Sequence, residues 1–149
     1  MNQPKLPDFR KMTSSTMILA PQLNVPDRSF TEGFPGVPGG LIEWFGIRFD
    51  AKIQIADAGS YRFLLTSDDG SKLYIDGDSV IDNDTLHPMT QRTGTKTLAA
   101  GTHTIRVDYF QGPRYDIGLI LQWVRPGTAV VEAIPSDRFL LPDPVTIVQ

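Results

Sequence analysis

Two adjacent carboxylates, Asp68 and Asp69, stand near the middle of the chain and are followed by Gly70. Neighbouring carboxylates repel each other, so a folded protein keeps such a pair mainly where water or a cation compensates the charge. Calcium takes about six to eight oxygen ligands, and paired aspartates in a loop supply several of them. A solvated turn is the alternative, because Asp and Gly are common in turns. Both interpretations stay open on the residues alone.

Further aspartates follow shortly after this pair. They are Asp76, Asp78, Asp82 and Asp84. An EF-hand calcium loop needs a fixed ligand spacing and a closing Glu, and both are missing here. The Gly77-Asp78 pair between two apolar stretches is instead typical of a two-residue hairpin turn. We therefore interpret these aspartates as turn residues.

Motifs that support catalysis are absent from the sequence. It contains no nucleophile elbow, no HExxH zinc motif and no phosphate-binding glycine loop. Asp68 and Asp69 are adjacent on one strand, whereas glycoside hydrolysis needs carboxylates about 5 Å or more apart that flank the scissile bond. We therefore expect no catalytic residue and a protein that is not an enzyme.

Composition excludes several classes of partner. The net charge is −3 and there is no basic run, so nothing favours nucleic acid or an anionic membrane surface. The absence of cysteine rules out disulfides and thiolate metal sites. No apolar stretch reaches the roughly 18 residues of a membrane helix, and the first residues lack the apolar core of a signal peptide. We expect no nucleic acid partner and no membrane insertion.

Short strands joined by many turns are expected to position the aspartate pair. Of the 17 acidic residues 14 are Asp, and the chain has 13 Gly and 12 Pro, which favour turns over helices. Apolar and polar residues alternate in residues 47–55 and 103–110, which indicates strands with one buried face. The alternation predicts one shared core that contains Phe49, Ile53, Phe63, Leu65, Ile105 and Val107.

Other segments complete an all-β pattern typical of an antiparallel sandwich or barrel. The further strands are expected at residues 61–67, 72–76, 79–82, 96–99, 117–124, 139–141 and 145–148. Residues 83–95 are expected to form a polar loop, and Met17–Ala20 is a short apolar run compatible with a strand. We expect residues 41–149 to form the domain and residues 1–40 to be an N-terminal extended segment or linker.

Several segments, in order, resemble the protective-antigen fourteen-kilodalton domain family. They are GFPG (33–36), EWFGIRFD (43–50), GSYRFLLTSDDGSKLYIDG (59–77), VIDND (80–84) and AGTHTIRVDYFQGPR (100–114), followed by an apolar strand. The match covers about residues 30–125. It implies an antiparallel β-sandwich of barrel-like, jelly-roll-like shape. It also implies an extracellular or cell-surface protein, since members occur in bacterial toxins, glycosidases, adhesins and cell-wall proteins.

The resemblance also implies a calcium site. In the lectin branch of the family, paired aspartates joined by a cis peptide hold a calcium ion that contacts sugar hydroxyls. Asp68 and Asp69 occupy these positions. The lectins complete the site from a second loop with an asparagine and a nearby tryptophan, and the matching loop here, residues 111–116, lacks both. Gln111 and Asp116 are the candidates for a further metal-binding oxygen.

A carbohydrate, either a glycan or a polysaccharide, is the ligand that this resemblance implies beside the metal. The residues expected to contact it besides Asp68 and Asp69 are Asn83, His87, Gln111, Arg114 and Tyr115, with Tyr115 as a flat face for a sugar ring. His103 stands where the family has a histidine, and we interpret it as a structural hydrogen-bonding residue. Trp44 and Trp123 lie in strand contexts and are interpreted as packing residues.

The function expected from the sequence is therefore that of a non-catalytic, calcium-dependent carbohydrate-binding module. The alternative is a structural or assembly module that contacts a protein partner within a larger surface or filament protein, for example through residues 1–40. An open groove beside the aspartate pair favours the first function. A large buried contact elsewhere favours the second.

Overall fold

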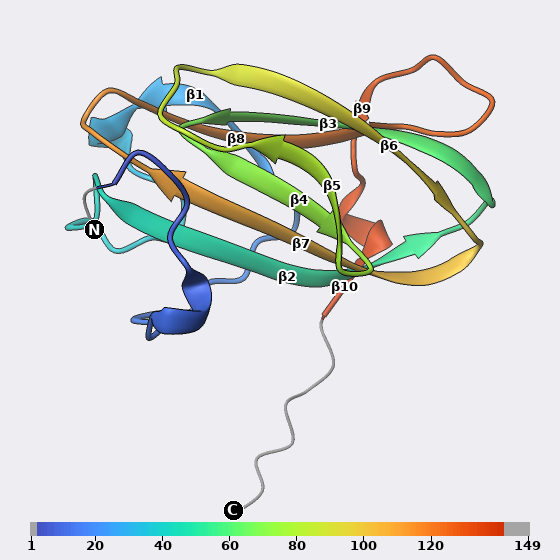
Figure 1. Ribbon diagram of the computed structural model, residues 1–149, viewed down its shortest axis with the longest axis horizontal. Coiled ribbons are helices and arrows are strands. Elements are labelled where there is room, and N and C mark those ends of the chain that lie inside the picture. Colours follow the sequence, from blue (N-terminus) through green and yellow to red (C-terminus); the bar gives the residue numbers. More distant parts are fainter. Residues whose placement is uncertain (1–2, 142–149) are drawn as a thin grey trace, which may run out of the picture.

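Two antiparallel sheets pack face to face in the computed structural model, which describes residues 3–141 (Figure 1). Sheet A has the order β1 (Asn24–Ser29), β8 (Asp116–Val124), β3 (Gly59–Asp68) and β6 (Thr90–Leu98), and the short β9 (Glu132–Ala133) also pairs with β8. Sheet B has the order β10 (Phe139–Leu140), β2 (Phe45–Ile55), β7 (Gly101–Gln111), β4 (Ser71–Ile75) and β5 (Asp78–Asn83). The all-β sandwich is confirmed, and its two sheets remain separate layers rather than a closed barrel.

Helical structure is limited to short 3-10 turns in the described residues. These are η1 (Phe9–Lys11), η2 (Phe30–Glu32) and η3 (Ser136–Arg138). Residues 3–141 therefore contain no helix with the length and apolarity needed to cross a membrane.

The core lies between the two sheets and follows from the alternation of apolar residues. Five of the six residues predicted for it are at most 4% exposed, and Phe49 is partly buried and packs against them. The aromatic rings of Tyr61 and Trp123 also meet in this core, with their centroids 5.4 Å apart. Burial of this apolar surface is the main force that holds the sheets together.

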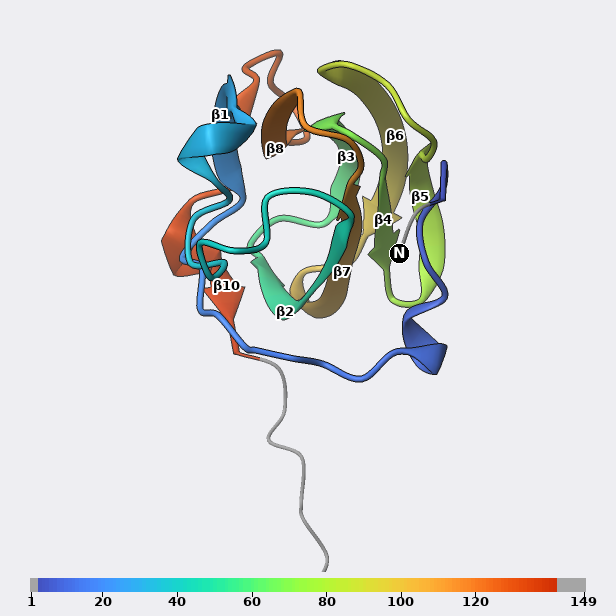
Figure 2. The same ribbon diagram turned by 90° about the vertical axis from the view of Figure 1, so that its left-hand side faces the viewer.

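Strand β6 corrects the prediction of a polar loop at residues 83–95. Residues 90–98 form a long strand at the edge of sheet A, and only Leu98 in it is fully buried. Its side chains are mostly polar because one face meets solvent, so apolar alternation is missing. At Gly94 an added Cβ would lie 2.1 Å from the main-chain oxygen of Val80 in β5. The two sheets therefore touch along this side of the sandwich, where β5 and β6 lie together (Figure 2).

The hairpin between β4 and β5 turns one residue earlier than expected. Ile75 pairs with Asp78, so the two turn residues are Asp76 and Gly77 rather than Gly77 and Asp78. Both have positive φ, 52° and 83°. A tight hairpin turn of this kind needs positive φ at both positions, and Asp-Gly is a preferred pair for it.

The N-terminal region is partly built into the sandwich. Strand β1 pairs with β8, and Leu23, Val25 and Phe34 belong to the common core. Residues 17–20, the apolar run compatible with a strand, are not in a strand; they are extended, with Met17 and Leu19 exposed and Ile18 packed against Gly36. The strand expected at residues 145–148 lies outside the described residues.

Candidate functional site

The two aspartates lie where the chain crosses from one sheet to the other. Asp68 ends β3 of sheet A and pairs with Gly118 of β8, and β4 of sheet B begins at Ser71. The Asp68-Asp69 peptide bond is cis, as the resemblance implies. Both residues are buried, with 5% and 6% of their surface exposed. The crossing therefore places two carboxylates at one end of the sandwich, beneath the loops that follow β5 and β7.

Asp69 fastens these loops together. Its Oδ1 accepts a hydrogen bond from the main-chain N–H of His87 (3.1 Å), and its Oδ2 accepts one from the N–H of Gly112 (2.8 Å). A Cβ at Gly112 would lie 2.9 Å from that oxygen and 2.4 Å from the Leu86 side chain, so glycine is required for the close approach. Burial raises the pKa of Asp69 and the two hydrogen bonds lower it, with a net increase.

The carboxylate of Asp68 receives no hydrogen bond from any residue in the described range. Burial raises its pKa to about 7, and the negative charges of Asp69, Asp116 and Asp27 contribute to the increase. Its main-chain oxygen accepts a hydrogen bond from the hydroxyl of Tyr109 at 2.6 Å. Its oxygens keep some contact with solvent, because they are not among the fully buried side-chain atoms that lack a partner in the described residues, so water, a proton or a cation can compensate the charge. Asp68 is therefore the group at this end of the molecule that most needs a partner.

Two of the predicted site residues are buried beneath the loops. Gln111 is fully buried, and its amide nitrogen donates to the main-chain oxygens of Pro113 (3.2 Å) and Asp116 (3.0 Å). Asn83 is 3% exposed, and its amide donates to Ser67 Oγ (3.1 Å) and the Thr90 carbonyl (2.9 Å). These contacts fix the shape of the loops and leave neither amide nitrogen directed to a ligand.

The remaining predicted residues form an accessible rim. Tyr115 is 73% exposed, and Asp116 is also exposed. Arg114 is exposed and forms an ion pair with Glu43 at 2.7 Å. His87 is half-buried, with its two ring nitrogens 2.9 Å from the carbonyl oxygens of Pro88 and Asn83. The structure thus brings together a buried acidic floor and a polar and aromatic rim.

Two residues that sequence analysis did not assign to the site lie beside it. Asp27 sits at an irregularity in β1, with its Cα 3.5 Å from where a Cβ on Gly118 would be. Trp44 is half-buried, and its main-chain N–H donates to the carbonyl of Gly112 at 3.0 Å. Both placements depend on pairing between distant segments, and no local motif marks them.

A family model of the PA14 domain, which is the protective-antigen fourteen-kilodalton domain, matches residues 42–137. That range is well over half of the 149-residue chain. The chain belongs to the PA14 domain family. No curated protein sequence matches the chain significantly.

Solved structures with the same fold include other PA14 domains. The PA14 domain of the MpAFP antifreeze protein has a TM-score of 0.75 and 18% identity, with 98% of this chain and 88% of that one covered. A PA14 sugar-binding domain from an RTX adhesin has a TM-score of 0.65 and 20% identity, with 81% and 76% covered. An anti-sigma factor domain-containing protein has a TM-score of 0.73 and 24% identity over 85% of this chain, which spans only 42% of that protein.

The oxygen atoms around Asp68 and Asp69 in this PA14 domain are of the kinds that bind calcium. Calcium accepts carboxylates, main-chain carbonyls and water. Within residues 3–141, no three Asp, Glu or His side chains converge as a complete metal cage. Asp68 nevertheless offers an unbonded buried carboxylate beside Asp69. The residues therefore fit a site of two carboxylates completed by carbonyls and water.

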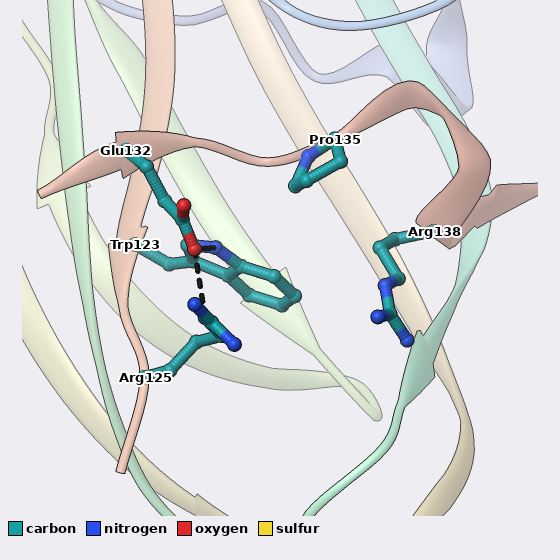
Figure 3. A pocket seen from close by; sticks show the side chains of 5 residues that line it. All are labelled: Trp123, Arg125, Glu132, Pro135 and Arg138. Carbon is teal, nitrogen blue, oxygen red and sulfur yellow. Dashed lines mark hydrogen bonds and ion pairs between the residues drawn. The ribbon is translucent and has the colours of Figure 1, made fainter. Parts of the chain in front are cut away.

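A small pocket of about 180 Å³ lies at a different place in the PA14 domain (Figure 3). Trp123 forms part of its wall but is only 2% exposed, and its ring N–H donates to Glu132 at 3.1 Å. Glu132 also pairs with Arg125 at 2.7 Å. Trp123 is a packing residue, as expected. It lies five residues along β8 from Gly118, about 17 Å away, so this pocket is not part of the aspartate site.

Proposed function

We propose that this PA14 domain is a non-catalytic, calcium-dependent carbohydrate-binding module of an exported or surface-associated protein. The observation that carries the proposal is the Asp68 carboxylate, which is buried beside Asp69 without a hydrogen-bond donor. Asp68 and Asp69 would hold the ion, with Asp116, main-chain carbonyls and water as further oxygen donors. When bound, calcium supplies open coordination positions that two neighbouring sugar hydroxyls can fill.

The exposed rim supports a sugar rather than a flat apolar partner. Tyr115 presents an aromatic ring to solvent, and the exposed guanidinium of Arg114 can hydrogen-bond to hydroxyls, whereas both ring nitrogens of His87 already lie 2.9 Å from carbonyl oxygens. Since Gln111 and Asn83 are engaged in the loops, we assign them the positioning of the rim. A small rim buries little area, so we expect a dissociation constant on the order of millimolar per site and useful avidity through several copies.

Relatives support the same function. One structural neighbour is a sugar-binding PA14 domain from an RTX adhesin. That likeness motivates the choice of carbohydrate as the ligand and of a surface protein as the parent.

Calorimetric titration with calcium, followed by a glycan screen with and without chelator, tests the proposal. We expect one bound calcium ion in the unaltered chain and none in Asp68→Asn. Asp57→Asn is the matched control, because Asp57 is an exposed aspartate just before β3, away from the loops. Tyr115→Ala should bind calcium normally and sugar more weakly.

Two results would count against the proposal. If calorimetry detects no calcium binding, the aspartate pair has only a structural role, in which Asp69 holds the two loops. If the protein holds calcium but a broad screen gives no calcium-dependent glycan, the assembly module with a protein partner becomes the better function.

A further inference from the structure

A second groove lies on the outer face of sheet B, under the N-terminal segment. Its volume is about 490 Å³, within the range of about 300 to 1,000 Å³ typical of small-ligand sites. One wall is the segment Leu6–Arg10, and the floor is formed by β2, β7 and β4. Leu6 N–H donates to Asp84 at 2.8 Å, and the Phe9 ring packs on Gly46, where an added Cβ would be 3.0 Å from it. The wall is therefore fixed by specific contacts.

The floor contains two arginines but only one carboxylate between them. Arg48 donates to both oxygens of Asp108, from Nε at 2.8 Å and from Nη2 at 3.2 Å. Arg106 Nε lies 3.7 Å from the same carboxylate, beyond hydrogen-bond distance, and is buried without a partner. The guanidinium of Arg106 stacks on the ring of Tyr74, with its carbon 4.0 Å from the ring centroid. It donates no hydrogen bond to any residue in the range 3–141.

The other charges of the groove are already paired. Lys72 contacts Asp82 at 3.1 Å and Asp84 at 3.5 Å, and Asp8 pairs with Arg10 at 2.9 Å. Asp50 lies opposite Arg106 on β2 but is exposed and forms no ion pair within 4 Å in the described range. Arg106 is thus the cation of the groove whose ion pair, to Asp108 at 3.7 Å, includes no hydrogen bond in the described residues.

We propose that this groove binds the carboxylate of an acidic saccharide, a uronic acid residue, with Arg106 as the main contact. A guanidinium is planar, and two of its N–H groups can donate to the two oxygens of a carboxylate. Its single positive charge also balances the single negative charge of the carboxylate. Oxygens of Asp8 and Asp84 line the same groove and can accept hydrogen bonds from sugar hydroxyls. The site does not use the aspartate pair, so it is independent of calcium and of the proposed function.

A saccharide fits this groove better than a peptide. Peptides often bind by adding a strand to an open sheet edge. Here β7 and β4, which carry Arg106 and Tyr74, are paired on both sides, whereas β2 is paired with β10 only at Lys52 and Ile53, so no free main-chain edge lies beside Arg106. Recognition must come from side chains, which suits a ligand made of hydroxyls and one carboxylate.

Calorimetry or NMR titration with trigalacturonate in the presence of chelator tests the proposal. The matched ligand control is the same trisaccharide with its carboxylates methyl-esterified, because it keeps the rings and all of their hydroxyls and loses only the negative charges. The variant is Arg106→Gln, and Arg62→Gln removes an exposed arginine from the outer face of sheet A as a control. We expect binding at least tenfold weaker for Arg106→Gln, within twofold of normal for Arg62→Gln, and undetectable for the ester. Asp68→Asn should leave the binding unchanged.

Other outcomes would overturn the proposal. They are equal binding of the ester, equal binding by Arg106→Gln, or tighter binding of a tetraglutamate peptide than of trigalacturonate. If Arg106→Gln proves unstable in a thermal melt, chemical-shift changes in the unaltered protein decide instead. Shifts confined to β4, β7 and residues 6–10 support the site, and shifts elsewhere contradict it.

Discussion

Asp68 and Asp69 are neighbours in sequence, but their environments differ in a way that decides how each can be tested. Both oxygens of Asp69 accept main-chain hydrogen bonds, whereas the carboxylate of Asp68 accepts none in the described structure. Asp69 therefore stabilises the loops, and Asp68 is the freer donor for a cation. Substitution of Asp69 would confuse the loss of a ligand with the loss of loop structure.

Asp68→Asn should remove the charge without breaking a hydrogen bond. Without calcium at pH 8, we expect the free energy of unfolding to rise by about 1 kcal/mol, because an uncompensated buried charge is lost. Asp69→Asn should lower it by roughly 1.5–3 kcal/mol, since one charged acceptor is replaced by an amide nitrogen that faces an N–H. Urea unfolding of both variants measures the difference. A lower stability for Asp68→Asn than for Asp69→Asn would contradict the assignment.

The raised pKa of Asp68 predicts a pH dependence. The pKa of Asp68 in the folded state, about 7, lies above the ordinary aspartate value of 3.8, so the folded state binds this proton more tightly. The stabilising contribution is therefore complete below about pH 4 and is lost as the pH rises to 7. His103 acts in the same direction, because its hydrogen bond to Asp76 raises its pKa. The measurement is the free energy of unfolding as a function of pH. The contribution of Asp68 is the part of its decrease between pH 4 and 7 that is absent in Asp68→Asn.

Calcium should compete with that proton. We expect affinity to fall by up to about tenfold per pH unit below pH 7, because the carboxylate must lose its proton to bind the ion. Calorimetry in two buffers with different ionisation enthalpies measures the proton released at pH 6. An affinity that is constant from pH 5 to 8 would exclude Asp68 as a ligand.

At the scale of elements, the alternation of apolar and polar residues predicted the strands that have one apolar face. It missed most of β6, whose residues are mostly polar. Residues 47–55 and 103–110 fall within β2 and β7, which pair along their whole length. Strand β6 has Thr residues on its outer face and Gly94 beside β5, so nothing apolar marks it before Leu98. The aspartate pair was found from sequence, but the burial of Gln111 and the position of Asp27 follow from long-range pairing.

Gly94 makes possible the contact between β5 and β6. Gly94→Ala should lower the free energy of unfolding by roughly 1–3 kcal/mol, because the new methyl group would overlap the Val80 carbonyl and push the strands apart. Gly77→Ala is a control for the loss of a glycine with no such contact, since open space surrounds it, although its positive φ adds a cost of its own. Thermal unfolding together with amide exchange in β5 measures the effect. Unchanged exchange at Val80 and Ile81 would contradict the close approach.

At the scale of the whole molecule, the N-terminal region contains two parts with different roles. Residues 23–34 supply β1 and core side chains, whereas residues 3–12 lie on the surface of sheet B. The sequence suggested one segment for both because Pro and Gly hide the single strand that pairs across the molecule with β8.

Truncation separates these two parts. Removal of residues 1–12 should leave a folded domain, with a melting temperature lower by a few degrees from the loss of the contacts of Leu6 and Phe9. Removal of residues 1–34 should abolish cooperative unfolding, because Leu23, Val25 and Phe34 leave the core. Circular dichroism melts check both. A cooperative transition in the longer truncation would show that β1 is dispensable.

The position of β10 has a practical consequence for presentation of the binding loops. Phe139 pairs with Ile53, eight residues along β2 from Phe45, which pairs with Gln111 at the loop end. Leu140, the last residue of β10, pairs with Lys52 and thus lies about 23 Å along β2 from the loops. A sensor surface or a bead coupled after Leu141 should leave the loops oriented outward and open to large polysaccharides.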